Sequence, residues 1–282
     1  MYFPKNFKLN DSVEIGELVA QAYSQYECFE NETKWNLHGN YTLICELFYT
    51  WESINPFDKN SSIIDNFKKR NILNKQIVKM PIGFIAQRKN RLYVIFRGTK
   101  TVKEWISNLH TKLTKYFITD FGSVHDGFIN TYLNIRDLMI DNIRLSPRTQ
   151  VYIGGHSLGA SFATFALTDI ELNLHRKVNA LYTYGSPRIG DNQFVELFNK
   201  NFQNITFRIV NTSDVVTSIP LPIILPGING GFFSHVDNPV DFTIQTNDIE
   251  KNHNIHTYIT ELKKYCTSGI LIWKKIKKMN NL

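Results

Sequence analysis

Ser157 stands at the centre of Gly155-His156-Ser157-Leu158-Gly159, a stretch of the form Gly-x-Ser-x-Gly. The short apolar run at 151–153 predicts a strand before it, and residues 158–174 predict a helix after it. A serine on so sharp a turn has a strained backbone and an exposed hydroxyl, and flanking glycines remove the side chains that would clash. The pattern also fits an ordinary turn, but the small residues at 159–163 let a helix lie close to a sheet. That context favours a nucleophilic serine.

A serine is a weak nucleophile at its own pKa, so it needs an imidazole to accept its proton and a carboxylate to orient that imidazole. The expected chain order is serine, aspartate, histidine. Asp214 is the best candidate for the acid because it follows a predicted strand at 205–210 after a short polar stretch. The other candidate acids are Asp191, Asp237 and Asp241. The candidate bases are His235, His253 and His256, and chain order alone does not choose among them.

Strands that alternate with helices must position these residues. The periodicity predicts helices at 11–29, 41–52, 127–143, 158–174 and 191–202, and strands at 151–153, 180–184 and 205–210. Two apolar runs at 83–86 and 92–96 flank the polar turn at 88–90 and predict an antiparallel hairpin. The alternation predicts an α/β fold with a mainly parallel central sheet and helices on both faces. Reactive groups on such a sheet gather beyond the carboxyl ends of the strands.

Length and composition fit one large domain of 282 residues with a formal net charge of +7. The one basic cluster, at 273–278, predicts a solvated end or a transient contact with a membrane surface, and nothing near it resembles a nucleic-acid module. Three widely separated cysteines argue against disulfides or a cysteine metal site and favour a reducing compartment. We see no signal peptide and no apolar stretch approaching the roughly 18 residues of a membrane span, which predicts a cytoplasmic or peripheral membrane protein.

Several separate segments resemble the class 3 lipases, a family of α/β-hydrolases typified by fungal triacylglycerol lipases. The matching segments are 94–99 with Trp105 and Asn108, 124–128 with Tyr132, the turn around Ser157, 184–190, 211–215, and His253 with Tyr258. They span about 83–262 in the family's order. Within a single domain, the resemblance leaves a helical N-terminal part at 1–80, a catalytic core at 83–262 and a basic tail at 263–282.

The resemblance implies roles for individual residues. Asp214 matches the family's acid, and His253 is the expected base because its distance to Tyr258 fits the family's terminal motif, in which the histidine opens a helix. His256 stays an alternative base, His235 matches a structural position, and His156 packs beneath the nucleophile. The oxyanion donors would be the main-chain N–H groups of Thr99 and Leu158, with the Thr99 hydroxyl as a further donor.

Two apolar segments are candidates for the substrate side. Residues 102–109 correspond to the family's lid, where Trp105 and Ile106 either face a lipid surface or pack in the core. The loop at 219–228, with Leu221, Ile223 and Ile224, is broken by prolines and would line an acyl groove, touch a membrane or pack against the C-terminal segment.

These inferences predict hydrolysis of a fatty-acyl ester of a glycerolipid through an acyl-enzyme, with no metal or organic cofactor required. The alternatives with the same triad are a phospholipase A1, a galactolipase, a short-chain esterase or an acyltransferase. The alternative that is not an enzyme is a lipid-binding protein without catalytic activity. The sequence carries no signal of the oligomeric state.

Overall fold

A computed structural model describes residues 1–54, 75–99, 106, 112–147, 150–222, 232–236 and 238–266. The strands are β1 (Thr42–Ile54), β2 (Lys75–Arg88), β3 (Arg91–Phe96), β4 (Leu113–Lys115), β5 (Ser123–His125), β6 (Gln150–His156), β7 (Val178–Tyr184), β8 (Thr206–Asn211) and β9 (Pro239–Phe242). The helices are α1 (Leu9–Glu30), α4 (Asp126–Leu145), α5 (Leu158–Leu172), α6 (Asn192–Phe202) and α7 (Ile249–His253), with 3-10 turns η1 (Gln203–Ile205) and η2 (Val215–Ser218). Residues 255–266 are also helical.

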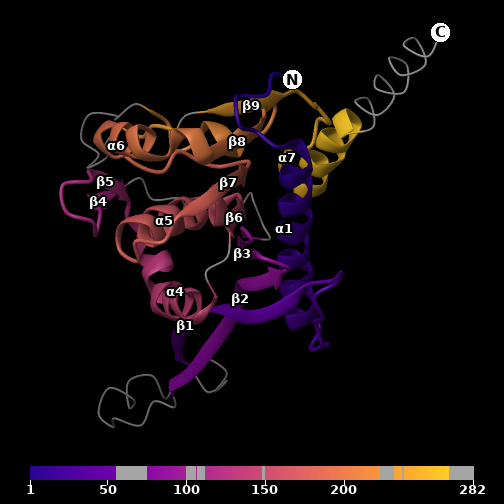
Figure 1. The fold of residues 1–282 in the computed structure, drawn as a ribbon, viewed down its shortest axis with the longest axis vertical. Helices are drawn as coiled ribbons and strands as arrows, with labels where there is room; N and C mark the ends of the chain where they lie inside the picture. Colours follow the sequence, from indigo (N-terminus) through magenta and orange to yellow (C-terminus); the bar gives the residue numbers. More distant parts are fainter. Residues whose placement is uncertain are drawn as a thin grey trace, which may run out of the picture.

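A seven-stranded sheet in the order β1-β2-β3-β6-β7-β8-β9 runs through the molecule (Figure 1). The pairs from β3 to β9 are parallel, whereas β1, β2 and β3 pair antiparallel. Helices α4, α5 and α6 lie on one side of the sheet, and α1 and α7 on the other. The prediction of a mainly parallel sheet covered on both faces is confirmed.

Strand β3 shows why helices pack on both faces of the sheet: its apolar side chains point to both sides. Leu92, Val94 and Phe96 point into one apolar cluster with side chains of α4, α5 and α6. Tyr93 and Ile95 point into a second cluster, which α1 and the helix at 255–266 complete. Side chains alternate between the faces of a strand, and a strand buried on both sides therefore reads as an unbroken apolar run.

The predicted helix at 41–52 is wrong, and so is a helical N-terminal part that extends past α1. This segment belongs to β1, an edge strand paired antiparallel with β2. Leu47 on β1 is buried in the first cluster, while its neighbour Glu46 points to the other side and accepts a hydrogen bond of 2.6 Å from Gln25 of α1. The physical reason is that side chains two apart share a face of the sheet, and the aromatic and β-branched residues here suit a strand.

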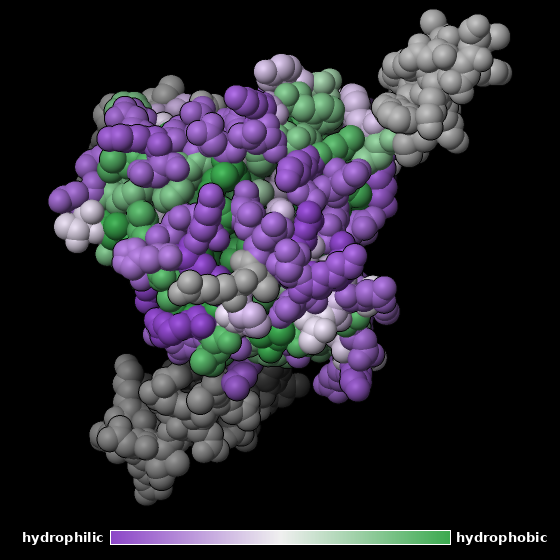
Figure 2. Space-filling view, in the orientation of Figure 1, coloured by the Kyte–Doolittle hydropathy of each residue, from purple (hydrophilic) through white to green (hydrophobic). Residues whose placement is uncertain are grey.

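The other predicted elements in the described residues occur with small shifts at their ends, except that β2 begins at Lys75, eight residues before the predicted run at 83–86. The hairpin of β2 and β3 turns at Lys89, which has a positive φ of 54°. Ser157 and Gly185 follow β6 and β7 directly, and Gly98 and Asp214 come two and three residues after β3 and β8, so all four lie at the carboxyl ends of neighbouring parallel strands. No helix within the described ranges is long and apolar enough to cross a membrane. In the view of Figure 2, hydrophilic residues predominate and hydrophobic ones appear in patches between them.

Candidate active site

Ser157 occupies the turn between β6 and α5 with φ 57° and ψ −130°, a left-handed backbone that a residue with a side chain rarely adopts. The flanking positions must be glycine because neighbouring backbone atoms leave no room for a Cβ. A Cβ on Gly155 would lie 2.1 Å from the carbonyl oxygen of Gly159, and a Cβ on Gly159 would lie 2.5 Å from that of Arg97. The strain is therefore maintained by close packing on both sides, as at many functional positions.

The Ser157 hydroxyl is enclosed, which differs from the exposed hydroxyl that the turn pattern predicts. Ser157 is 0% exposed. The backbone at Gly98 passes close to this residue, so that a Cβ on Gly98 would lie 2.5 Å from the Cβ of Ser157. The strained turn is therefore present, but the serine on it is buried and lies against the segment after β3.

Asp214 and His253 form a buried pair on the same edge of the sheet. Nδ1 of His253 lies 2.6 Å from Oδ2 of Asp214. The same carboxylate accepts a hydrogen bond of 2.5 Å from the Tyr258 hydroxyl and one of 2.9 Å from the N–H of Val216 at the start of η2. An oxygen that accepts from Nδ1 fixes the imidazole so that Nε2 is the atom left for other chemistry.

Two asparagines hold the loops that carry this pair. The Asn211 side chain donates to the carbonyl oxygens of Ile244 and Asn252, at 3.0 and 2.9 Å. Asn252 in turn donates to the carbonyl oxygen of Ser213 at 3.2 Å. Each asparagine lies within three residues of Asp214 or His253, so buried amides tie the two loops together. The supporting role of the Asn211 side chain was missed in the sequence analysis.

The turn of Ser157 lies against the His253 loop. The imidazole rings of His156 and His253 have centroids 4.4 Å apart, and a Cβ on Gly185 would lie 2.9 Å from Asp214 Oδ2 and 3.0 Å from His253 Cε1. Among the described residues, Ser157 Oγ and His253 Nε2 are both buried without a hydrogen-bond partner. The structure therefore brings the three segments together but does not join the hydroxyl to the imidazole.

The expected oxyanion donors lie on either side of this serine. Leu158 is the first residue of α5, where N–H groups have no carbonyl partner within the helix and the helix dipole favours negative charge. Thr99 follows Gly98 directly, and its Oγ1 is another buried atom with no partner in the described part of the chain. A substrate oxygen would satisfy such atoms.

The alternative acids and bases occupy other environments. Asp191 caps α6 by accepting from the N–H of Phe194 at 2.8 Å, and Asp241 is exposed on β9, while Asp237 lies outside the described residues. His256 is exposed on the helix at 255–266. His253 is the last residue of α7 and precedes that helix by two positions, so it does not itself open it.

His235 is held away from this pair and hydrogen-bonded to the protein backbone. Its Nε2 lies 2.7 Å from the carbonyl oxygen of Thr217. Burial, followed by the nearby positive charge of Arg208, lowers the pKa of His235 to about 3, so its imidazole is neutral near pH 7. This environment matches the structural role expected for it.

Some of the residues predicted to lie on the substrate side fall outside the described residues. Trp105, Ile223 and Ile224 lie outside them, Ile106 is half-buried and Leu221 is 66% exposed. No cluster of His, Cys, Asp and Glu that could hold a metal ion occurs in the described ranges.

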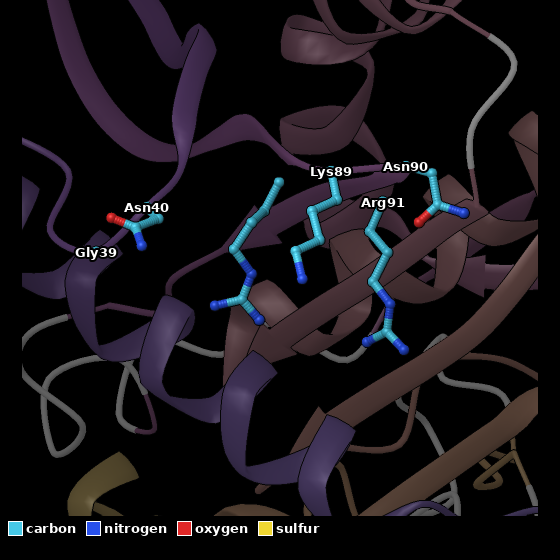
Figure 3. Close-up of a pocket in the computed structure, with 6 residues that line it drawn as sticks. Gly39, Asn40, Lys89, Asn90 and Arg91 are labelled. Carbon is cyan, nitrogen blue, oxygen red and sulfur yellow. The ribbon is translucent and has the colours of Figure 1, made fainter.

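A polar hollow elsewhere on the molecule is not part of this site. Figure 3 shows it at the turn between β2 and β3, lined by Arg88, Lys89 and Arg91 with Gly39, Asn40 and Asn90. Arg91 begins β3 and therefore lies at the strand end opposite Gly98. Arg88 and Arg91 are engaged by carboxylates of α1, with Arg88 2.5 Å from Glu14 and Arg91 2.8 Å from Asp11.

Comparison with known proteins supports the resemblance seen in the sequence. Residues 93–223 match the family model described as Lipase (class 3). This segment of the chain belongs to the class 3 lipases. The chain is 32% identical over 148 residues to Phospholipase A(1) DAD1, chloroplastic, of Arabidopsis thaliana, covering 45% of this chain and 33% of that protein. It is 28% identical over 169 residues to a lipase of Rhizomucor miehei, covering 56% of this chain and 46% of that protein.

The match thus spans a third to about half the length of these two relatives. The fold extends further than the sequence match. The solved structure of the Rhizomucor miehei lipase propeptide complex shares 19% identity with a TM-score of 0.60, covering 93% of this chain and 81% of that one. This likeness establishes the α/β-hydrolase fold.

Proposed function

We propose that the protein hydrolyses fatty-acyl carboxylic esters of glycerolipids, with Ser157 as nucleophile, His253 as base and Asp214 as the acid that orients it. The observation that carries the proposal is the buried Asp214–His253 pair beside a serine held at φ 57° on a strand-to-helix turn. Three polar atoms there, on Thr99, Ser157 and His253, are buried without partners in the described residues. Buried polar groups are normally satisfied. A substrate carbonyl oxygen would accept from the Thr99 hydroxyl, and the Ser157 hydroxyl would donate to Nε2 of His253 as it attacks the carbonyl carbon.

The reaction runs in two halves. Ser157 Oγ attacks the ester carbonyl carbon while its proton passes to Nε2 of His253, and the N–H groups of Thr99 and Leu158 hold the oxyanion. The carbon–oxygen bond to the alcohol then breaks, and the alcohol leaves with the proton from His253. Water repeats the sequence on the acyl-enzyme, which releases the carboxylic acid and restores Ser157. The related Arabidopsis protein is named a phospholipase A(1), which adds phospholipid esters to the substrates to be tested.

The decisive experiment measures hydrolysis of p-nitrophenyl esters of increasing chain length by the purified protein. We expect turnover to favour longer acyl chains and to vanish in Ser157→Ala, while the melting temperature stays close to that of the unmodified protein. Equal turnover in the two proteins would refute the assignment. Product analysis with and without an added acceptor alcohol separates hydrolysis from acyl transfer.

We further propose a transient contact with a membrane surface around the exposed apolar residues that follow Asp214. Val215, Leu221 and Phe232 are 39%, 66% and 58% exposed. Apolar side chains exposed near a lipid-ester site favour insertion into a membrane surface. The Leu221→Ser/Phe232→Ser protein should sediment less with anionic lipid vesicles. Leu145→Ser is the matched control, because Leu145 is 85% exposed at the end of α4, before β6 begins. Equal sedimentation of all three proteins would contradict this contact.

A reducing compartment remains the location we propose. Cys28, Cys45 and Cys266 are all half-buried free thiols. Thiol titration of protein isolated from its natural source should find three free thiols per chain, and oxidised cysteines would contradict the proposal.

A further inference from the structure

One tyrosine of α1 connects the three chain segments that carry the proposed reacting groups. The Tyr23 hydroxyl lies 2.6 Å from Nδ1 of His156 and 3.0 Å from the N–H nitrogen of Gly98. Nε2 of His156 lies 2.7 Å from the carbonyl oxygen of His253. Gly98 precedes Thr99 and His156 precedes Ser157, so each link attaches directly beside a proposed reacting residue.

The chemistry of the partners fixes the direction of every hydrogen bond. A carbonyl oxygen only accepts, so Nε2 of His156 must carry the hydrogen that it shares with His253. Burial, together with the nearby His253, lowers the pKa of His156 well below its ordinary value, which keeps the imidazole neutral and leaves Nδ1 as an acceptor. The Tyr23 hydroxyl therefore donates to His156, and its oxygen accepts from the N–H of Gly98. Burial raises the pKa of Tyr23, so the hydroxyl keeps its proton.

A second contact of α1 fastens the neighbouring residue of the same segment. The guanidinium of Arg97 lies 3.7 Å from the ring centroid of Tyr26, one helical turn after Tyr23. Arg97 also donates to the carbonyl oxygens of Pro81 and Gly98, at 2.9 and 2.5 Å. Burial lowers the pKa of Arg97 to about 10, so the group stays charged near pH 7. Arg97 and Gly98, which pass close to the turn of Ser157, are thus both held by α1.

We propose that Tyr23 is a positioning residue that sets the distance between the oxyanion donors and the nucleophile turn. The inference rests on the proposed ester hydrolysis. Because Tyr23 occupies the N–H of Gly98, the next amide, that of Thr99, is the one left to meet a substrate oxygen. The hydroxyl also holds His156 in the tautomer that bonds the backbone of His253. Helix α1 lies outside the segment matched by the class 3 lipase model. The residue that positions Gly98 and His156 therefore comes from another part of the chain.

The test compares Tyr23→Phe with Tyr116→Phe. Each change removes one buried tyrosine hydroxyl and keeps the ring, but the Tyr116 hydroxyl bonds Thr168 Oγ1 in the apolar cluster on the other face of the sheet. We expect kcat for a p-nitrophenyl ester to fall about 10- to 100-fold in Tyr23→Phe with KM little changed, because small misplacements of reacting groups cost that much. Tyr116→Phe should keep kcat within about twofold. Equal kcat in Tyr23→Phe and the unmodified protein would overturn the proposal.

A second measurement does not depend on turnover. The ¹⁵N NMR shift of His156 Nδ1 and the hydrogen exchange of the Gly98 and Thr99 amides should change in Tyr23→Phe and stay unchanged in Tyr116→Phe. Unchanged signals in Tyr23→Phe would also overturn the inference. An unmodified protein that cleaves no ester, with the NMR changes present, would refute the proposed function and leave the hydrogen-bond chain established.

Discussion

Nδ1 of His253 and Oδ2 of Asp214 are 2.6 Å apart, and their side chains are 2% and 0% exposed. The carboxylate accepts two further hydrogen bonds, from the Tyr258 hydroxyl and the N–H of Val216, so no rotation of Asp214 keeps all three partners. A carboxylate held so firmly dictates the orientation of the imidazole beside it. The predictions below test whether that orientation serves catalysis.

Asp214→Asn should lower kcat by about 10³- to 10⁴-fold, because an amide that donates to Nδ1 would stabilise the wrong tautomer of His253. Steady-state ester hydrolysis measures the loss. Asp191→Asn is the matched control, since the two carboxylate oxygens of Asp191 accept from the N–H groups of Phe194 and Ser123, and an amide can accept only one of these bonds. Its change should reduce stability rather than kcat. A larger loss of kcat in Asp191→Asn would move the acid to that residue.

His253→Ala should abolish measurable turnover, whereas His256→Ala should retain most of it. His253 is 2% exposed and bonded to Asp214, while His256 is exposed on the following helix. The same esterase assay on both variants decides which histidine is the base. The opposite ranking would make His256 the base.

Gly98→Ala should reduce kcat by about 100-fold and lower the free energy of unfolding by about 1 to 3 kcal/mol. The added methyl group would lie 2.5 Å from the Cβ of Ser157 and 2.8 Å from the carbonyl oxygen of His156, so the segment after β3 must shift. Gly127→Ala is the control. Its nearest contact would be an ordinary 3.4 Å to Cε1 of His125, just before α4, and it should raise stability by up to about 1 kcal/mol without changing kcat. Urea unfolding and esterase assays test both variants, and an active Gly98→Ala protein would show that the close packing against Ser157 is not needed.

The local features of this site could be predicted from the sequence, because they depend on short patterns. The turn around Ser157 lies between an apolar strand and a helix with small residues, and Gly155 is needed because of a contact within that same stretch. Gly159, by contrast, is needed because of Arg97 on the segment after β3. Strand β1 was missed because aromatic and polar residues at 41–52 fit helical as well as alternating spacing. Only its pairing with β2 decides between them.

The enclosure of Ser157 and the role of Tyr23 could not be predicted in this way. Tyr23 meets His156 across 133 positions of the chain and Gly98 across 75, so no local pattern records either contact. The close approach of Gly98 to Ser157 likewise joins segments that are distant in the sequence. The organisation of the chain as one domain stays a prediction.

The free energy of unfolding should fall as the pH drops below about 6.5, in part because His235 is neutral in the folded protein. Its pKa of about 3 in the folded state lies below the ordinary value of 6.5, so between these values the unfolded chain binds a proton that the folded protein does not. Stability therefore decreases with falling pH, by at most about 1.4 kcal/mol per pH unit from this group, and the loss levels off near pH 3. His235→Gln can still donate a hydrogen bond toward the carbonyl oxygen of Thr217 but cannot titrate. Between pH 7.5 and 5, urea unfolding of this variant should show a loss smaller than that of the unmodified protein by about 1 to 2 kcal/mol. His256→Gln, which replaces an exposed histidine, is the matched control, and identical pH dependence in His235→Gln and the unmodified protein would contradict the prediction.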